Sequence, residues 1–310
     1  MTYSASPVKR PRRTKAQMEA LRAELYTLVR DAQPCTVRHV YYLGLGRLWE
    51  KDTGRSRRNY SVPVRELGYM REHGLLPWEW ITDGTRLVRQ DLQYDSMLEA
   101  LERTAETYRR NLWASQPRRV EAWCESDSVS GVLLPVTTKW GVGLYSCRGQ
   151  SSKTFVHEAV LQARGKPLTV LYAGDWDPSG RAVPRSVVER IGRYGDNGID
   201  LDFQQIAVTA DDVRSGRLVS HEANTADSNF KRYREECLRE GLDPHEAVEV
   251  EALSPGTLRD RLDAAIERQV RDVRQWNVLA RAEQHDRSTL LAVQEALEAH
   301  FKHQEPGGSA

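Results

Sequence analysis

The chain has 310 residues, of which 39% are hydrophobic and 29% are charged. This length and apolar fraction are sufficient for a buried core in each of two ordinary domains. No segment approaches the roughly 20 apolar residues that a membrane helix needs, and the basic N-terminal residues are not followed by the apolar stretch of a secretion signal. We therefore expect a cytoplasmic protein without a membrane partner, and association with the nucleoid is the alternative location.

Charge is distributed unevenly along the chain. Residues 1–118 contain 21 Lys and Arg against 14 Asp and Glu, whereas the remaining residues contain 24 and 30. A basic front part joined to an acidic back part is typical of a DNA-binding module followed by a metal-binding one. The alternative is that the arginines only form solvent-exposed, charged helix surfaces.

Helical patterns begin after a short N-terminal tail. Residues 1–13 mix Pro, Ser and basic side chains without periodicity, which predicts a flexible basic tail. Apolar residues then recur at helical spacing until Pro34. Thr36 is a suitable N-cap for a second helix, which we expect over residues 37–49.

The next segment predicts a DNA-binding module of the winged-helix type. A helix is expected over residues 62–73, followed by an extended piece through Trp80 and Ile81. Helix, turn, helix and extended wing together indicate a winged-helix (CAP-like) module over residues 14–112. Its last part, residues 93–111, is expected to be a linking helix.

From Pro117 onward, short apolar runs alternate with amphipathic helices. The expected elements are strand 120–124, helix 128–138, strand 142–147, helix 151–164, strand 168–173, helix 179–193 and strand 203–208. Three successive crossovers predict a parallel, doubly wound sheet with helices on both faces. We expect this α/β domain over residues 118–255, and long amphipathic helices in a C-terminal extension over residues 256–310.

Three carboxylates follow two of these strands. Glu125 ends the first strand in the sequence Trp-Cys-Glu-Ser, and Asp175 and Asp177 follow the third in Gly-Asp-Trp-Asp-Pro-Ser-Gly. Loops at the carboxyl ends of neighbouring parallel strands share one edge of the sheet, so the three side chains converge if these strands are neighbours. Mg²⁺ prefers oxygen ligands and takes one or two protein carboxylates with water and phosphate oxygens. The sequence therefore predicts a Mg²⁺ site, with Mn²⁺ as the alternative metal, where Glu125 either shares the ion or acts as a general acid or base.

These positions resemble the Toprim domain of topoisomerases, bacterial primases and OLD-family nucleases. The resemblance rests on Glu125, on a loop at Gly149 and on the pair Asp175-x-Asp177. Ahead of this domain, residues 36–42 match the motif Thr/Ser-x-Arg-x-x-Tyr-Tyr of the topoisomerase VI A subunit and of its relative, the meiotic double-strand-break protein. The chain looks most like the shortened, stand-alone bacterial and phage relatives of that subunit.

The resemblance implies DNA strand cleavage by a homodimer. In that family, Tyr42 would be the nucleophile that becomes joined to a DNA 5′ phosphate, and Arg38 would stabilise the phenolate or the scissile phosphate. The Tyr42 of one subunit would meet the site of Glu125, Asp175 and Asp177 in the other. A separate ATPase subunit is a further implied partner, since the chain itself contains no such domain. Residues 78–84 and 147–152 differ from the family pattern, so the resemblance implies DNA cleavage more than the passage of one DNA duplex through another.

Basic residues near these motifs are candidate contacts to DNA. Arg55, Arg57 and Arg58 form a short basic run that can bind backbone phosphates. Arg148 lies at a strand-to-helix junction, where backbone N–H groups and the helix dipole favour a phosphate. The alternatives are a solvated loop for the first group and simple N-capping for the second.

Other interpretations of the same residues stay open. The loop that carries Asp177 can be a solvated turn in which this residue caps the following helix, and Tyr42 can belong to a helix core. A later acidic patch with Glu249 and Glu251 is interpreted as structural capping, with an approach of Glu251 to the metal site as the alternative. Two other functions therefore stand beside the first: a Toprim endonuclease that uses water as the nucleophile, and a non-catalytic DNA-binding scaffold.

Overall fold

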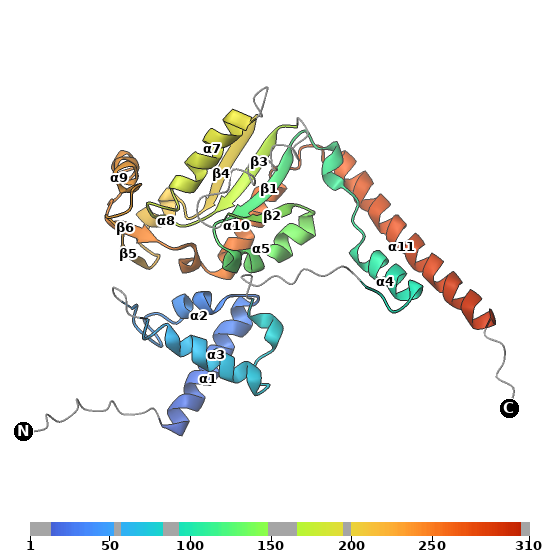
Figure 1. Cartoon of the computed structure of the whole chain (residues 1–310), viewed down its shortest axis with the longest axis horizontal. Helices are drawn as coiled ribbons and strands as arrows, with labels where there is room; N and C mark the ends of the chain where they lie inside the picture. Colours follow the sequence, from blue (N-terminus) through green and yellow to red (C-terminus); the bar gives the residue numbers. More distant parts are fainter. Residues whose placement is uncertain (1–13, 53–56, 83–92, 148–165, 195–199, 305–310) are drawn as a thin grey trace, which may run out of the picture.

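The computed structural model describes residues 14–52, 57–82, 93–147, 166–194 and 200–304 (Figure 1). They form a mixed α/β structure with a four-stranded parallel sheet. The predicted tail over residues 1–13 and the predicted helix over residues 151–164 lie outside the described residues. None of the described helices combines the length and the apolar character needed to cross a membrane.

Three helices build the N-terminal part, α1 (Lys15–Ala32), α2 (Val37–Leu43) and α3 (Ser61–Glu72). They pack around one apolar cluster that includes Leu25, Val40 and Leu67. Thr36 caps α2 as predicted, because its hydroxyl accepts a hydrogen bond from the His39 amide at 3.1 Å. The predicted helix over residues 62–73 is confirmed as α3, within one residue at each end.

The second helix is shorter than the sequence predicts, since α2 ends at Leu43 and not near residue 49. Its end is set by a close approach that only glycine allows. A Cβ atom at Gly44 would lie 2.5 Å from the Trp49 ring, and the Trp49 indole N–H donates to the Tyr41 carbonyl at 2.7 Å. The chain therefore turns back at Gly44 so that Trp49 can cover the helix end.

The region that follows α3 differs from the predicted extended piece. Residues Trp78–Trp80 form the 3₁₀ helix η1, and only Ile81 makes a bridge, to Cys35. Residues 83–92 lie outside the described part of the chain. The helical module is therefore observed, whereas the wing stays a prediction.

The sheet consists of β1 (Arg119–Cys124), β2 (Gly143–Ser146), β3 (Leu168–Ala173) and β4 (Leu201–Ala207). Its order is β2-β1-β3-β4, and all pairs are parallel. The four predicted strands are thus confirmed with boundary differences of one or two residues. Because β1 and β3 are neighbours, with Cys124 opposite Ala173, their carboxyl ends lie side by side.

Helices cover both faces of this sheet, as predicted. On one face, α5 (Asp127–Trp140) and α10 (Pro255–Glu267) pack against Ala122 and Leu171. On the other face, α7 (Ala182–Tyr194) packs against Trp123 and Tyr172. Figure 1 shows the sheet between these helices. Side chains alternate between the two faces because successive residues of a strand point to opposite sides.

Smaller elements complete the sheet domain. Helix α8 (Ala210–Arg214) is followed by β5 (Ser220–Glu222), helix α9 (Phe230–Arg239) and β6 (Glu246–Val248), and β5 and β6 form an antiparallel pair. The 3₁₀ helix η3 (Val250–Ala252) follows β6. Figure 1 shows that α2 lies on the side of the N-terminal helices nearest to β5 and β6. This packing brings two parts of the chain with very different charge together.

A long helical arm leaves the sheet domain (Figure 1). It is formed by α11 (Val273–Gln304) with α4 (Met97–Thr107), and the 3₁₀ helix η2 (Leu112–Ser115) connects α4 to β1. Asp286 on α11 accepts a hydrogen bond from the Tyr108 hydroxyl at 2.8 Å and pairs with Arg110 at 2.8 Å. The predicted helix over residues 93–111 is therefore shortened to α4, which begins after the N-cap Ser96.

Candidate functional site

Two of the three predicted site residues, Glu125 and Asp175, lie side by side at the carboxyl edge of the sheet, where the Glu125 carboxylate contacts the Asp175 backbone. The Glu125 amide continues the β1–β3 ladder by donating to the Ala173 carbonyl at 3.0 Å. The Glu125 side chain then accepts the Asp175 amide at 2.9 Å through Oε2. The predicted convergence at the ends of β1 and β3 is therefore observed for Glu125 and Asp175.

The third carboxylate, Asp177, caps the turn that leads into α7. Its Oδ1 accepts the Gly180 amide at 2.6 Å, which agrees with the N-cap interpretation. Its negative charge also acts on Glu125 and on Asp175. Asp177 therefore contributes both a cap and a charge to the same edge.

Gly180 makes this arrangement possible. A Cβ atom at this position would lie 2.5 Å from the Asp175 carbonyl oxygen and 3.0 Å from Glu125 Oε2. We expect Gly180→Ala to push the loop away from Glu125 and to lower the free energy of unfolding by about 1–3 kcal/mol, as overpacking does. Urea unfolding measures this loss.

A helical glycine in open space provides the control for that variant. A Cβ atom at Gly68 in α3 would meet nothing within 4 Å, so Gly68→Ala should leave the stability unchanged or raise it by up to about 1 kcal/mol. Equal stability of Gly180→Ala and Gly68→Ala would contradict the close packing of the Asp175 loop.

A distant segment of the chain is fixed to the Asp175–Asp177 loop by its backbone. Trp176 and Val248 exchange two hydrogen bonds, of 2.8 and 2.9 Å, and the Val250 amide donates to Asp175 Oδ1 at 2.8 Å. Glu249 and Glu251 therefore lie beside the predicted site. The sequence interpretation of this acidic patch as structural capping did not anticipate this pairing.

Glu251 faces the carboxylate cluster. Its side chain is buried, with 5% of its surface exposed, and it accepts a hydrogen bond from the Ser128 hydroxyl at 3.0 Å. Its charge acts on both Glu125 and Asp175. The alternative in which Glu251 approaches the site is thus the one that the structure supports.

These four carboxyl groups form an acidic cluster, although the charge of Arg38 acts on Glu251 and that of His221 acts on Asp177. Burial, followed by repulsion from the neighbouring carboxylates, raises the pKa of Glu125 and raises that of Asp175 well above its usual range. Burial is also the main cause of the raised pKa values of Asp177 and Glu251. Within the described ranges, none of the four forms a salt bridge. Concentrated negative charge of this kind favours a cation.

The donor set fits a magnesium ion by its chemistry, although the side chains are not gathered as ligands. Among the described residues, no group of three or more His, Cys, Asp or Glu side chains is arranged to hold a metal ion. The reason is that Glu125, Asp175 and Asp177 each turn one oxygen toward a backbone amide. Mg²⁺ needs only one or two protein carboxylates, since water and phosphate oxygens complete its shell.

The repulsion predicts a stability gain from Asp175→Asn. Because the pKa of Asp175 is raised in the folded protein, its contribution to stability is full below the unfolded pKa of about 3.9 and is lost as the pH rises through the folded pKa. Without divalent metal at neutral pH, the variant should be more stable than wild type, by on the order of 1 kcal/mol.

Urea unfolding at several pH values with a chelator measures this gain. Wild-type stability should fall more steeply with rising pH above about pH 4 than that of the variant. Addition of Mg²⁺ should then stabilise wild type more than Asp175→Asn. Equal stabilisation of both proteins by Mg²⁺ would argue against a metal site at Asp175.

Tyr42 and Arg38 lie one turn apart on α2, and both bind Glu249. The Tyr42 hydroxyl donates to Glu249 Oε2. Arg38 Nε donates to the same oxygen at 3.0 Å, and its Nη2 pairs with Oε1. The resemblance implies that Tyr42 serves the site of another subunit, whereas here it contacts Glu249 of its own chain.

The electrostatics of this triad are asymmetric. Burial, followed by the nearby Glu249 charge, raises the pKa of the Tyr42 phenol. Burial alone would also raise the pKa of Glu249, but the Arg38 guanidinium and the Tyr42 hydroxyl lower it below its ordinary value. At neutral pH, the triad therefore holds a carboxylate that accepts from a neutral phenol.

A small basic pocket opens beside Tyr42. Its volume is about 260 Å³, and its lining residues are Arg38, Tyr41, Tyr42, Lys51, Asp52, Arg57, Tyr60 and Glu249. The predicted DNA contact Arg57 belongs to this pocket, and Arg58 is exposed next to it in the sequence. Arg55 and Arg148 lie outside the described residues.

Two further basic groups near this pocket were not predicted from the sequence. Lys51 donates to the Ser220 carbonyl at 2.9 Å. On the same strand β5, the buried Nδ1 of His221 has no hydrogen-bond partner among the described residues. The negative charge of Glu249 acts on both groups. Single Lys and His residues far apart in the sequence carry no local signal that could have identified them.

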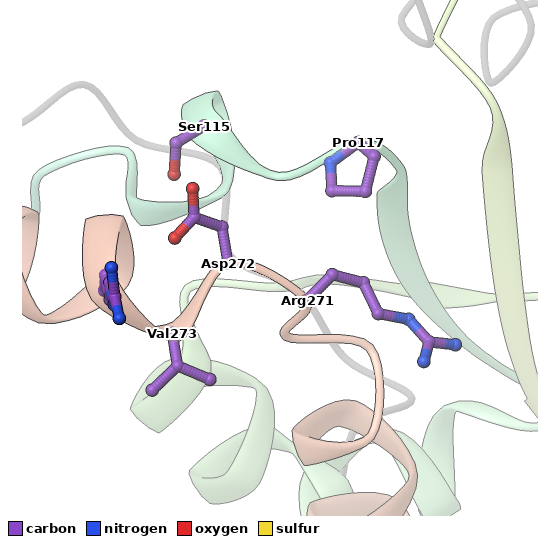
Figure 2. Close-up of a pocket in the computed structure, with 6 residues that line it drawn as sticks. Ser115, Pro117, Arg271, Asp272 and Val273 are labelled. Atoms are coloured by element: carbon purple, nitrogen blue, oxygen red, sulfur yellow. The ribbon is translucent and has the colours of Figure 1, made fainter.

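A second pocket, of about 590 Å³, lies where η2 and β1 pass the turn between α10 and α11. Figure 2 shows Ser115 and Asp272 facing one another across it, with the Arg271 guanidinium pointing away. The neighbouring Gln116 is buried and ties the two segments together by accepting the amides of Arg271 and Asp272. None of the predicted site residues lines this pocket, and we interpret it as a structural junction.

The described residues thus define a mixed α/β protein with an acidic cluster at the carboxyl edge of a parallel sheet and a tyrosine triad beside it. No family model matches the chain, and no curated protein matches it. The function is therefore inferred from the site itself.

Proposed function

We propose that this protein is a metal-dependent enzyme that cleaves DNA strands, with Tyr42 as the nucleophile. In this proposal, Glu125, Asp175 and Asp177 hold a Mg²⁺ ion in a Toprim-type site, and Mn²⁺ is the alternative metal. The helices before the sheet serve as a winged-helix DNA-binding module. The Toprim and winged-helix assignments are part of the same proposal.

The pairing of Trp176 with Val248 is the observation that carries this proposal. It fixes Glu249 next to the carboxylate loop, and Glu249 in turn binds Tyr42 and Arg38. A candidate nucleophile, a cation and a set of carboxylates without salt-bridge partners among the described residues are thereby connected within one network. Phosphoryl transfer needs these three kinds of group in proximity.

The expected division of chemistry follows from the side chains. The bound metal ion would neutralise charge on the phosphodiester and polarise it. Tyr42 would attack phosphorus, and Arg38 would stabilise the negative charge that develops on the phosphate oxygens. Glu125 would either share the metal ion or act as a general acid or base on the leaving oxygen.

DNA is the substrate that the charge distribution favours. The first 118 residues carry the excess of Lys and Arg, and Arg38, Lys51 and Arg57 line the pocket beside Tyr42. A pocket of about 260 Å³ is large enough for a phosphate group. Cations around such a space bind backbone phosphates without reading sequence.

A hydrolytic Toprim nuclease is the second candidate. The observation in its favour is the raised pKa of the Tyr42 phenol, caused by burial and by Glu249, because a phenol that resists ionisation is a poor nucleophile. In that case, water would attack and Tyr42 would serve the structure.

A second copy of the chain is the proposed partner, and a separate ATPase subunit is a further one. The arm exposes several apolar side chains, with Met97 on α4 and Val278, Leu291 and Val293 on α11 each more than two-fifths exposed. Such a surface supports an interface between copies.

Supercoiled plasmid tests the proposed function. Wild-type protein with Mg²⁺ or Mn²⁺ should convert it to nicked or linear DNA, and protein should be attached covalently to the DNA 5′ ends. A chelator should stop the reaction. DNA binding that is insensitive to metal and produces no cleavage would instead indicate a scaffold.

A further inference from the structure

Glu249 is the only described side chain that accepts a hydrogen bond from the Tyr42 hydroxyl. Its carboxylate is held from both sides, because Arg38 binds both of its oxygens and its backbone neighbours pair with the Asp175–Asp177 loop. Arg38 is 45% exposed, whereas Glu249 is 20% exposed. A carboxylate held this firmly against a phenol is placed to receive its proton.

We propose that Glu249 accepts the phenolic proton of Tyr42 during DNA cleavage and that Arg38 holds Glu249 in position for this transfer. This inference rests on the proposed function. As the bond from Tyr42 Oη to phosphorus forms, the bond from phosphorus to O3′ breaks. The phenolic proton passes to Glu249, and O3′ leaves with a proton from water.

The timing of the transfer follows from the electrostatics of the triad. In the free protein the phenol stays neutral, since burial and then the nearby Glu249 charge raise the pKa of Tyr42. Bond formation to phosphorus withdraws electrons from the phenolic oxygen and makes its proton acidic. The proton then moves to Glu249 in the same step, as in general base catalysis.

The neighbouring basic groups fit this role less well. Lys51 Nζ lies 5.5 Å from the centre of the Tyr42 ring and donates a hydrogen bond to the Ser220 carbonyl. His221 has no contact with the Tyr42 hydroxyl among the described hydrogen bonds. Glu249 is therefore the acceptor that the geometry selects.

Glu249→Gln tests the inference, because the amide keeps the size of the side chain but does not take a proton. We expect formation of the 5′ adduct to fall by about 10² to 10⁴-fold, while DNA binding is retained. Glu222→Gln is the matched control, since Glu222 is an exposed glutamate on the neighbouring strand β5. It should form the adduct at the wild-type rate.

A fluorinated tyrosine separates a base from a merely structural residue. Replacement of Tyr42 by 3,5-difluorotyrosine, which ionises at much lower pH than tyrosine, should restore most of the adduct formation in Glu249→Gln because a base is then no longer needed. A loss that persists with difluorotyrosine would overturn the inference, as would a wild-type rate in Glu249→Gln itself.

The contact can also be followed without any cleavage. A single 3-fluorotyrosine at position 42, observed by fluorine NMR, should ionise at lower pH in Glu249→Gln than in the otherwise wild-type protein. The other charged groups that face this phenol are Arg38, Lys51 and Glu251. An unchanged ionisation would overturn the contact. If the ionisation differs between the two proteins as expected but wild-type protein forms no covalent adduct with DNA, the contact is real and the proposed tyrosine chemistry is wrong. The role of Glu249 as a base is then wrong as well.

Discussion

Glu125→Gln should reduce metal-dependent plasmid cleavage by about 10³-fold, in the range that general acid–base and electrostatic groups supply. Glu125 connects the end of β1 to the loop that follows β3, because its carboxylate accepts the Asp175 amide and lies next to Gly180. The amide side chain can keep that hydrogen bond through its carbonyl oxygen. It loses the negative charge that favours a cation and the proton that a carboxyl group can donate.

Cleavage and folding are measured separately for this variant. Without metal, Glu125→Gln should be at least as stable as wild type, because the variant no longer has a negative charge that Asp177 and Glu251 repel. Burial and these two carboxylates raise the pKa of Glu125. Glu102→Gln is the control, because Glu102 is exposed on α4 and should cleave as wild type. Full activity in a well-folded Glu125→Gln would rule out the proposed metal site.

The strand ends could be predicted because their signal is local. The runs that became β1 and β3 are buried over nearly their whole length, and the acidic residues follow them closely in the sequence. Once the two strands are neighbours, the contact between Glu125 and Asp175 follows from the geometry of a parallel sheet.

The part of the site that contains Glu249 and Glu251 could not be predicted, because it depends on contacts between distant positions. Val248 pairs with Trp176 across the gap between β6 and the β3 loop. That pairing, together with the hydrogen bond from the Val250 amide to Asp175, places Glu249 and Glu251 beside the site. Local periodicity contains no information on it.

Helix ends show the same limit. The sequence from residue 37 to residue 49 has a helical pattern, but the Trp49 ring occupies the space beside Gly44 and turns the chain. Tertiary contact thereby overrides propensity.

Tyr42→Phe should abolish the covalent 5′ adduct, because the ring remains and only the attacking oxygen is removed. The aromatic contacts of Tyr42 with Tyr41 should hold the variant in its fold. The only described hydrogen bond of its hydroxyl goes to Glu249, which keeps Arg38 as a partner. Tyr69→Phe is the control, because Tyr69 stacks on His73 in α3, away from the pocket. Cleavage that survives Tyr42→Phe without an adduct would select the hydrolytic nuclease.

Mixing two inactive variants decides which chain supplies the tyrosine. If Tyr42 acts on the carboxylates of a second subunit, a dimer of Tyr42→Phe with Glu125→Gln contains one complete site and should regain part of the cleavage. The contact between Tyr42 and Glu249 joins groups of the same chain, so we expect no recovery. Recovery on mixing would mean that binding of DNA or of a second copy releases Tyr42 from Glu249, and α2 would then have to move away from η3, against which it now packs.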